Sequence, residues 1–158
     1  MKLPDIFAMV LHEANLTGQI TTDWVDQTQT VLIQRFVGDW SWQNCFWGLI
    51  KARRWITKSN RRVDFIFDLT ESGRFPKALR YTFREEWLWQ RVKWPKLIGR
   101  IVVVGGGQQI SELFDLRCKI APETMKYFRR VNTLEEAFAL LKTWVLDDDA
   151  PPFDEIAI

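Results

Sequence analysis

Residues 63–76 of the chain, VDFIFDLTESGRFP, contain the pattern that decides its predicted fold. The first seven residues, VDFIFDL, are rich in β-branched and aromatic side chains, which is typical of a strand buried on both faces. Hydroxyl side chains and Gly73 follow as a turn. Pro76 suits the first turn of a helix, because its missing N–H would be unpaired there in any case. A buried strand that leads into a helix indicates an α/β fold.

The same alternation of strand and helix extends in both directions from this stretch. Ser41 is a predicted helix N-cap, and Thr133 with Glu136 matches a capping box. We expect strands at 20–25, 30–36, 63–69, 100–106 and 126–131, and helices at 41–60, 76–91, 108–120 and 133–145. The first two strands form an N-terminal β-hairpin, whereas strands that alternate with helices pair in parallel through right-handed connections. The predicted fold is α/β, with a single-layer, mixed, mostly parallel sheet of about five strands and an antiparallel edge strand.

One domain accounts for this pattern. A chain of 158 residues is long enough to bury roughly 70% of its unfolded surface. Residues 1–19 are an N-terminal extension with no assigned element, 20–146 form the domain, and 147–158 are an acidic, loose C-terminal tail. Cys45 and Cys118 form neither a disulfide framework nor a metal-binding pattern, and we expect both to be inert core thiols. No signal peptide or membrane-spanning stretch is visible, so we expect a reduced, cytoplasmic protein.

Four segments, taken in order, carry a resemblance to a known family. They are TVLIQRFVGDWSW at 30–42, VDFIFDLTESGRFPKAL at 63–79, GRIVVVGGG at 99–107 and YFRRVNTLEEAFALL at 127–141. Together they resemble the STAS-like superfamily, the fold of bacterial anti-anti-sigma factors, and within it the divergent branch of anti-sigma-factor-antagonist-like domains of unknown function. The similarity covers about Ile20 to Trp144. It implies a four-turn βα superhelix on one mixed sheet and a regulatory role through protein–protein interaction.

The turn after the strand at 63–69 is where this resemblance bears on function. Phosphoregulated members of the family carry a serine within a D-S-S-G-like motif at the start of the next helix, where free N–H groups and the helix dipole favour a phosphate. Ser72 and Gly73 lie in a comparable region, but Glu71 precedes them and the helix is expected to begin later. Thr70 and Ser72 are therefore candidate phosphate acceptors or ligand-turn residues. The alternative is that the turn is only a structural connection.

A glycine-rich loop follows the strand at 100–106. Gly105, Gly106, Gly107 and Gln108 lie between a strand and a helix, where such a loop can hold an anion or a ligand. A dinucleotide fingerprint would need a glycine where Ile110 stands, and the Gly-Lys-Ser/Thr of a P-loop is absent. The alternative is a turn of left-handed glycines that lets the helix begin close to the strand.

Residue types suited to bond breaking are scarce where a site is expected. His12 is the only histidine, which excludes histidine-based triads and multi-histidine metal sites. In open parallel sheets, ligands gather beyond the carboxyl ends of the strands. In this chain those ends are 38–39, 70–72, 105–109 and 132–133, which offer hydroxyls, amides and N–H groups but no histidine, lysine or cysteine. We therefore expect a surface that holds a partner or an anion, and no enzyme, cofactor or metal.

The net charge of +2 hides an asymmetry. Residues 51–100 hold fourteen Lys or Arg against five Asp or Glu, a local charge of +9, so the rest of the chain carries −7. The segment KARRWITKSNRR contains six basic residues and no acid; we call them the basic stripe: Lys51, Arg53, Arg54, Lys58, Arg61 and Arg62. Such a stripe can attract nucleic acid or an anionic lipid surface. The simpler alternative is the solvated face of a surface helix.

Aromatic residues gather in REEWLWQRVKW, at 84–94. Tryptophan beside arginine is the usual composition of an interface anchor. Tyr81, Trp89 and Trp94 are therefore candidate interface residues. The alternative is that they are scattered surface aromatics.

Three functions of different classes remain open at this stage. The leading hypothesis is a non-catalytic interaction or regulatory module with a protein partner, which in one version is a homodimer formed through the aromatic residues of 76–91. The alternative is a module that holds a small apolar or lipid-like ligand, a role linked to related STAS-fold domains. Binding of nucleic acid or an anionic surface by the basic stripe is the least favoured.

Overall fold

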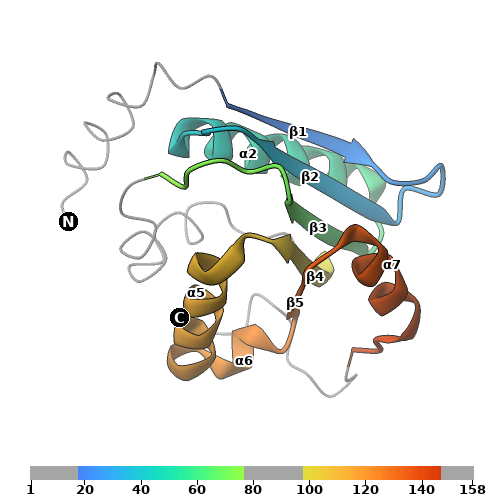
Figure 1. The fold of residues 1–158 in the computed structure, drawn as a ribbon. Helices are drawn as coiled ribbons and strands as arrows, with labels where there is room; N and C mark the ends of the chain where they lie inside the picture. The colour runs from blue at the N-terminus through green and yellow to red at the C-terminus, as the bar shows by residue number, and fades with distance from the viewer. Residues whose placement is uncertain (1–17, 77–97, 147–158) are drawn as a thin grey trace.

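The computed structural model describes residues 18–76 and 98–146, and both ranges contribute to one sheet with helices on its two faces (Figure 1). In chain order the described elements are β1 (Gln19–Trp24), β2 (Val31–Val37), α2 (Trp42–Ser59), β3 (Val63–Leu69), β4 (Ile98–Gly105), α5 (Gly107–Ile120), α6 (Pro122–Met125), β5 (Phe128–Val131) and α7 (Leu134–Thr143). Apart from Pro76, the predicted helix at 76–91 falls on residues outside the described ranges, as do most of the N-terminal extension and the whole acidic tail.

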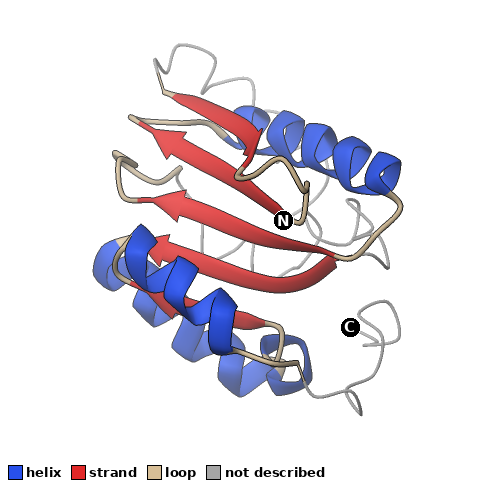
Figure 2. Ribbon diagram, turned by 90° about the vertical axis from the view of Figure 1, so that its right-hand side faces the viewer, coloured by secondary structure: helices blue, strands red, loops and turns tan. Residues whose placement is uncertain are grey.

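The five strands lie side by side in the order β1-β2-β3-β4-β5 (Figure 2). β1 pairs with β2 in the antiparallel sense, and β2, β3, β4 and β5 pair in parallel. The predicted fold class is confirmed: the chain is α/β, with a single mixed, mostly parallel sheet and an antiparallel edge strand. The strand order follows the chain order, as in a βα superhelix.

β3 is buried on both of its faces, as the sequence predicts. Phe65 and Ile66 are both 0% exposed, and they belong to two separate hydrophobic cores. The larger core lies between the sheet and the helices α2 and α5, and the smaller one lies under α7. The connections from β2 to β3 and from β4 to β5 step across the sheet in the same direction. Right-handed connections therefore place α2 and α5 on the same face.

Helix α2 begins where the sequence predicts. The Ser41 hydroxyl accepts a hydrogen bond from the backbone N–H of Asn44 at 3.1 Å, and the Asn44 side chain accepts one from the backbone N–H of Ser41 at 3.0 Å. This reciprocal pair satisfies two N–H groups that the first helical turn leaves unpaired. The buried residues of the helix recur at the three- and four-residue spacing of one helical face: Trp42, Cys45, Gly48, Leu49, Ala52 and Ile56. Thr133 and Glu136 form the same kind of capping box at the start of α7, which confirms that prediction.

The predicted strand at 126–131 is too long by two residues. Strand β5 begins at Phe128, because the short helix α6 occupies 122–125. Pro122 begins this helix, a position at which its missing N–H costs nothing. Tyr127 still contributes its carbonyl oxygen, which accepts a hydrogen bond from the N–H of Ile101 at 2.8 Å.

The two cysteines differ in their surroundings. Cys45 is buried in the larger core, and this burial raises the pKa of its thiol to about 12, in agreement with an inert core thiol. The prediction for Cys118 is wrong, because its side chain is exposed. Helix α5 buries Ile110 and Leu113, and Cys118 lies about 140° around the helix from Leu113 at 100° per residue. No helix in the described part of the chain is long and apolar enough to cross a membrane.

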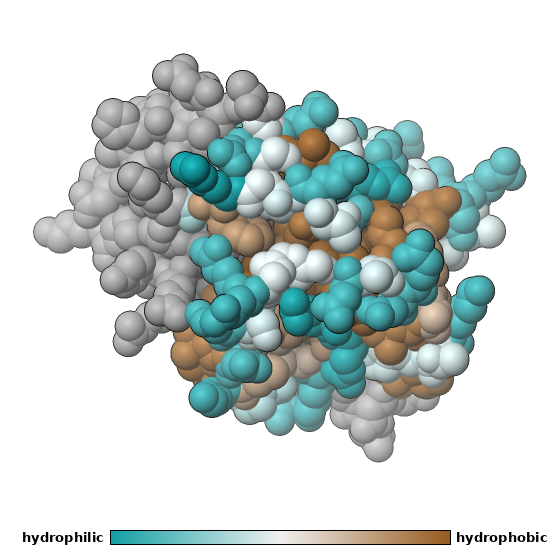
Figure 3. All heavy atoms as spheres, in the orientation of Figure 1, coloured by the Kyte–Doolittle hydropathy of each residue, from teal (hydrophilic) through white to brown (hydrophobic). Residues whose placement is uncertain are grey.

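Polar side chains cover much of the described surface in the view of Figure 3, and hydrophobic atoms show between them. Few large hydrophobic side chains of the described residues are exposed: Val25, Trp47, Ile120 and Val145. A binding surface on the described part of the molecule therefore has to be sought mainly among polar and charged groups.

Replacing Ser41 with alanine tests the first capping box. The substitution removes the acceptor of the Asn44 N–H at the start of an 18-residue helix that lines the larger core. We expect the free energy of unfolding to fall by about 1 kcal/mol, measured by urea denaturation. Thr57→Ala, at an exposed position of the same helix, is the control and should change it by less than about 0.5 kcal/mol. Equal losses in the two variants would contradict the role of the cap.

Candidate functional site

The carboxyl ends of β2, β3, β4 and β5 meet at one edge of the sheet, because these strands run parallel. We call this the carboxyl edge, and it comprises residues 38–40, 70–74, 105–109 and 130–133. The candidate turn with Thr70 and Ser72 and the candidate loop 105–108 both lie here. The structure therefore brings these two sequence-predicted features to the same edge.

The Ser72 hydroxyl is part of a structural contact. It accepts a hydrogen bond from the indole N–H of Trp40 at 2.8 Å, and the Trp40 side chain is only 3% exposed. Gly38 and Ser72 also form an isolated parallel bridge that extends the pairing of β2 with β3. The turn is thus held to the loop after β2 by its side chain and its backbone. This supports the alternative that the turn is a structural connection.

The Thr70 side chain is turned back toward the strand that precedes it. Its hydroxyl donates to Asp68 Oδ1 at 2.7 Å, and its backbone N–H donates to the same oxygen at 3.0 Å. Asp68 is 5% exposed, and its second oxygen lies 3.8 Å from Nε of Arg35. A buried carboxylate needs such partners, since an unpaired charge in the interior is costly. Thr70 therefore serves to satisfy Asp68.

Backbone groups of the two loops also pair with each other. The N–H of Gly38 donates to the carbonyl oxygen of Glu71 at 3.0 Å, and the N–H of Gly73 donates to that of Gly38 at 2.8 Å. Asp39 Oδ1 accepts a hydrogen bond from the N–H of Arg74 at 2.6 Å. A Cβ atom on Gly73 would lie 2.2 Å from that same oxygen, so the close approach of the two loops requires glycine.

The loop from Gly105 to Gly107 is a turn of left-handed glycines, as the alternative reading predicts. The φ angles of the three glycines are 75°, 80° and 59°, and Gly106 is the N-cap of α5. Arg130 donates to the carbonyl oxygens of Gly105 at 3.3 Å and of Gly107 at 3.2 Å. The side chain of Gln108 donates to Glu112 at 3.0 Å. The loop is therefore fixed by a cation from the neighbouring strand.

Trp40, Arg74 and Arg130 lie at this edge although no sequence pattern singles them out. Strand alternation shows that Arg129 and Arg130 point to opposite faces of the sheet. It cannot show which of the two reaches the glycine loop, because that depends on the register between β4 and β5.

The basic stripe lies away from the carboxyl edge, along the exposed side of α2 and the connection to β3. All six of its residues are exposed. Two of them have structural roles: Lys51 donates to the carbonyl oxygen of Thr22 at 3.3 Å and lies over the Trp55 ring, and Arg61 donates to the carbonyl oxygen of Thr28 at 3.0 Å. The stripe does not contribute to the loops described above.

Other predicted residues fall outside the described ranges. These are His12 and the three candidate interface residues Tyr81, Trp89 and Trp94. Within 18–76 and 98–146, no group of three or more His, Cys, Asp or Glu side chains is arranged to hold a metal ion.

Comparisons with known proteins add no family to this picture. No protein-family model matches the chain, and no curated protein sequence matches it.

Replacing Ser72 with alanine would leave the buried indole N–H of Trp40 without its acceptor. An unsatisfied buried donor costs about 1–3 kcal/mol, so we expect a loss of that size in the free energy of unfolding. Thr70→Ala should cost less, because the backbone N–H still satisfies Asp68. The double variant is expected to fold, with circular dichroism unchanged and a lower denaturation midpoint. A Ser72→Ala variant as stable as the parent would show that the hydrogen bond from the Trp40 indole does not contribute to the free energy of unfolding.

Gly106 and Gly107 provide a matched pair of substitutions in the glycine loop. A Cβ on Gly106 would lie 2.3 Å from Cγ1 of Ile110, whereas one on Gly107 would meet nothing within 4 Å. Both have positive φ, so alanine is strained at either position, by about 1 kcal/mol. We expect Gly106→Ala to be the more destabilising of the two in thermal denaturation, because only it adds a clash with a buried side chain. The reverse order would contradict the close packing of α5 on this loop.

Proposed function

We propose that the chain is a non-catalytic interaction module, of the STAS-like type, that binds a protein partner at the carboxyl edge. The resemblance of the four sequence segments and the sequential order of the strands support a regulatory domain of this kind. The proposed setting is the cytoplasm, where a reduced thiol such as exposed Cys118 is stable.

The observation that carries this proposal is the mutual bracing of the edge loops. The hydroxyls of Thr70 and Ser72 are engaged by Asp68 and Trp40, and the loop after β2 is tied to Gly73 through backbone hydrogen bonds. Hydroxyl and backbone groups that are hydrogen-bonded within the protein keep the surface of this edge in one shape. Partners that meet a preformed surface lose less conformational entropy on binding, which favours recognition.

The side chains that this surface offers are charged and polar. Glu71 and Arg74 are exposed on the turn after β3, and Gln108 is exposed at the start of α5. Charges of both signs close together give orientation and specificity to a protein contact more than raw affinity. A protein partner with a complementary arrangement of charge is therefore the ligand class proposed for this edge.

A charge swap at the edge tests the proposal. Glu71→Lys combined with Arg74→Glu keeps the net charge and reverses the local pattern. Wild-type and variant chains are used as bait in native cell extract, and the captured proteins are quantified by mass spectrometry. We expect at least one protein to be captured by the wild type and reduced about tenfold or more by the swap, since like-charge contacts at an interface oppose binding.

The matched control is Asp115→Lys with Lys119→Glu, on the exposed side of α5. It changes the same number and kind of charges away from the edge and should leave that capture unchanged. Capture that survives the edge swap, or that both swaps abolish equally, would contradict binding at the carboxyl edge.

A homodimer formed through Tyr81, Trp89 and Trp94 is the second form of this proposal. Sedimentation of the pure chain decides it: a dimer is expected to show a mass near twice the 18.8 kDa of one chain. A single species of monomer mass at high concentration would remove the homodimer without affecting the edge proposal.

A further inference from the structure

Helix α2 lies along one face of the sheet, and one side of the helix is turned away from that face (Figure 2). Successive residues of an α-helix are about 100° apart, so the side chains that lie opposite the buried Leu49 follow from the sequence. Four exposed residues lie within about 40° of the line opposite Leu49: Trp47, Lys51, Arg54 and Lys58. We call these four residues the outward face of α2.

Trp47 is the apolar group of the outward face. It is 59% exposed, whereas the other tryptophans of the described ranges are buried or half-buried. Its ring meets the ring of Phe46 edge-on, with 5.7 Å between the centroids. An indole has an apolar body and a polar N–H group, which together suit a boundary between water and an apolar medium. The exposure of Trp47 therefore calls for a partner that can take up both parts of the side chain.

Positive charge follows Trp47 along the helix. Lys51, Arg54 and Lys58 succeed it at intervals of three or four residues, so the outward face extends over about 16 Å at 1.5 Å per residue. Helix α2 contains no Asp or Glu. Arg54 and Lys58 make no hydrogen bond or ion pair with another residue of 18–76 or 98–146. Helix α5, which packs on the same core, has two acids and two bases and does not cancel this charge.

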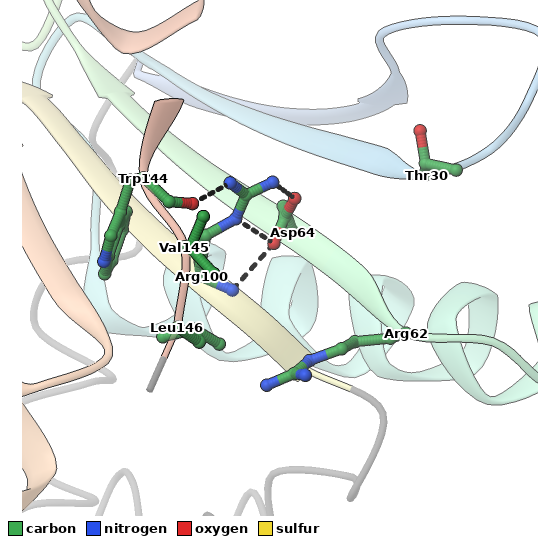
Figure 4. A pocket seen from close by; sticks show the side chains of 7 residues that line it. All are labelled: Thr30, Arg62, Asp64, Arg100, Trp144, Val145 and Leu146. Atoms are coloured by element: carbon green, nitrogen blue, oxygen red, sulfur yellow. Dashed lines mark hydrogen bonds and ion pairs between the residues drawn. The ribbon is translucent and has the colours of Figure 1, made fainter. Parts of the chain in front are cut away.

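A groove of about 310 Å³ where β2 and β3 begin gives the contrasting case (Figure 4). Arg100 lines this groove, and its guanidinium group pairs with Asp64, with 3.1 Å between Nε and Oδ1. The same group donates to the carbonyl oxygen of Leu141 at 2.6 Å. The charge of Arg100 is thus compensated inside the protein and holds the end of α7. Arg54 and Lys58 have no such partner among the described residues, so their charge is available to a ligand.

We propose that the outward face of α2 docks on the surface of an anionic lipid bilayer, with the Trp47 ring among the headgroups and Arg54 and Lys58 against their negative charges. Tryptophan is enriched where a membrane meets water. Each Lys or Arg close to an anionic bilayer adds an attraction that falls off within a Debye length. A few cations and one aromatic ring support a peripheral and reversible association.

The aromatic residues of α2 favour a bilayer over nucleic acid. Single-stranded nucleic acid is held by stacking of successive bases on several aromatic rings. Trp55, one turn or two along the helix from Trp47, is already stacked on Trp24 at 6.0 Å between centroids and lies under the ammonium group of Lys51. A duplex would use the cations for its phosphates and leave Trp47 without a role. A bilayer engages the cations and the exposed ring together.

Docking of this kind would orient the domain. Helices α2 and α7 pack on separate cores on the two faces of the sheet, so a bilayer against α2 leaves α7 turned away from it. The carboxyl edge shares no residue with the outward face. This inference does not depend on a partner at that edge, so either proposal can fail while the other stands.

Binding of the full chain to lipid vesicles tests the proposal. Vesicles of phosphatidylcholine mixed with phosphatidylserine are compared, at low salt, with pure phosphatidylcholine vesicles and with single-stranded and duplex DNA at the same phosphate concentration. We expect the mixed vesicles to bind at least about tenfold more tightly than each of the others. Equal binding to the two kinds of vesicle, or tighter binding to either DNA, would overturn the bilayer proposal.

Two variants separate the cations from the ring. Arg54→Gln with Lys58→Gln should weaken binding to the mixed vesicles about tenfold at low salt and much less in about 1 M salt, because salt screens the charges. Trp47→Ala should weaken it about tenfold at either salt concentration, because burial of the ring is not ionic. A Trp47→Ala variant that binds the mixed vesicles as tightly as the wild type would contradict the docking of this face.

The matched control is Lys119→Gln with Lys142→Gln, which removes two exposed cations from α5 and α7. It should weaken vesicle binding by less than about twofold, since neither residue lies on α2. All the residues replaced in these variants are exposed, so circular dichroism and the Tm should stay close to those of the wild type. Equal losses of binding in the control and in the Arg54 and Lys58 variant would assign the attraction to net charge and overturn docking through α2.

Discussion

The burial of β3 on both faces is the constraint on which the rest of the fold depends. Phe65 and Ile66 are adjacent in the sequence, and each is fully buried in a different core. Apolar side chains on both sides of a strand require a cover on both sides of the sheet, because an open side would leave one set in water. Helices α2 and α5 provide one cover and α7 provides the other. Once the strands are parallel and covered in this way, their carboxyl ends meet at one edge.

Hydrogen bonding at the carboxyl edge shows how its hydroxyl groups are used within the fold. A nucleophile needs a partner that removes its proton, whereas the Ser72 hydroxyl accepts a hydrogen bond from an indole and the Thr70 hydroxyl donates to an acid that already belongs to the core. Arg130 is directed to two carbonyl oxygens of the glycine loop. These contacts stabilise the shape of the surface, on which the proposed recognition role depends.

Local sequence patterns predict much of this fold, but they do not predict its long-range contacts. The strand at 63–69 and the caps Ser41 and Thr133 depend on a few neighbouring residues, and the structure has all three as predicted. The Trp40–Ser72 and Arg130–Gly105 contacts join residues 32 and 25 positions apart, and they depend on strand order and register. Periodicity carries no information on either. The wrong prediction that the Cys118 thiol is buried has a similar cause, because a short apolar run does not fix which side of α5 faces the core.

The two edges of the sheet divide the charge of the molecule in a way that bears on what it can bind. The carboxyl edge exposes one acid and one base close together in the sequence, Glu71 and Arg74, whereas Lys58, Arg61 and Arg62 are exposed where α2 leads into β3, toward the opposite edge. A cluster of cations attracts any polyanion, with an affinity that falls steeply as salt rises. An acid and a base on one short turn instead give orientation and specificity to a protein contact. The two edges therefore favour different classes of ligand: non-specific anions where β3 begins, and where it ends the protein partner proposed above.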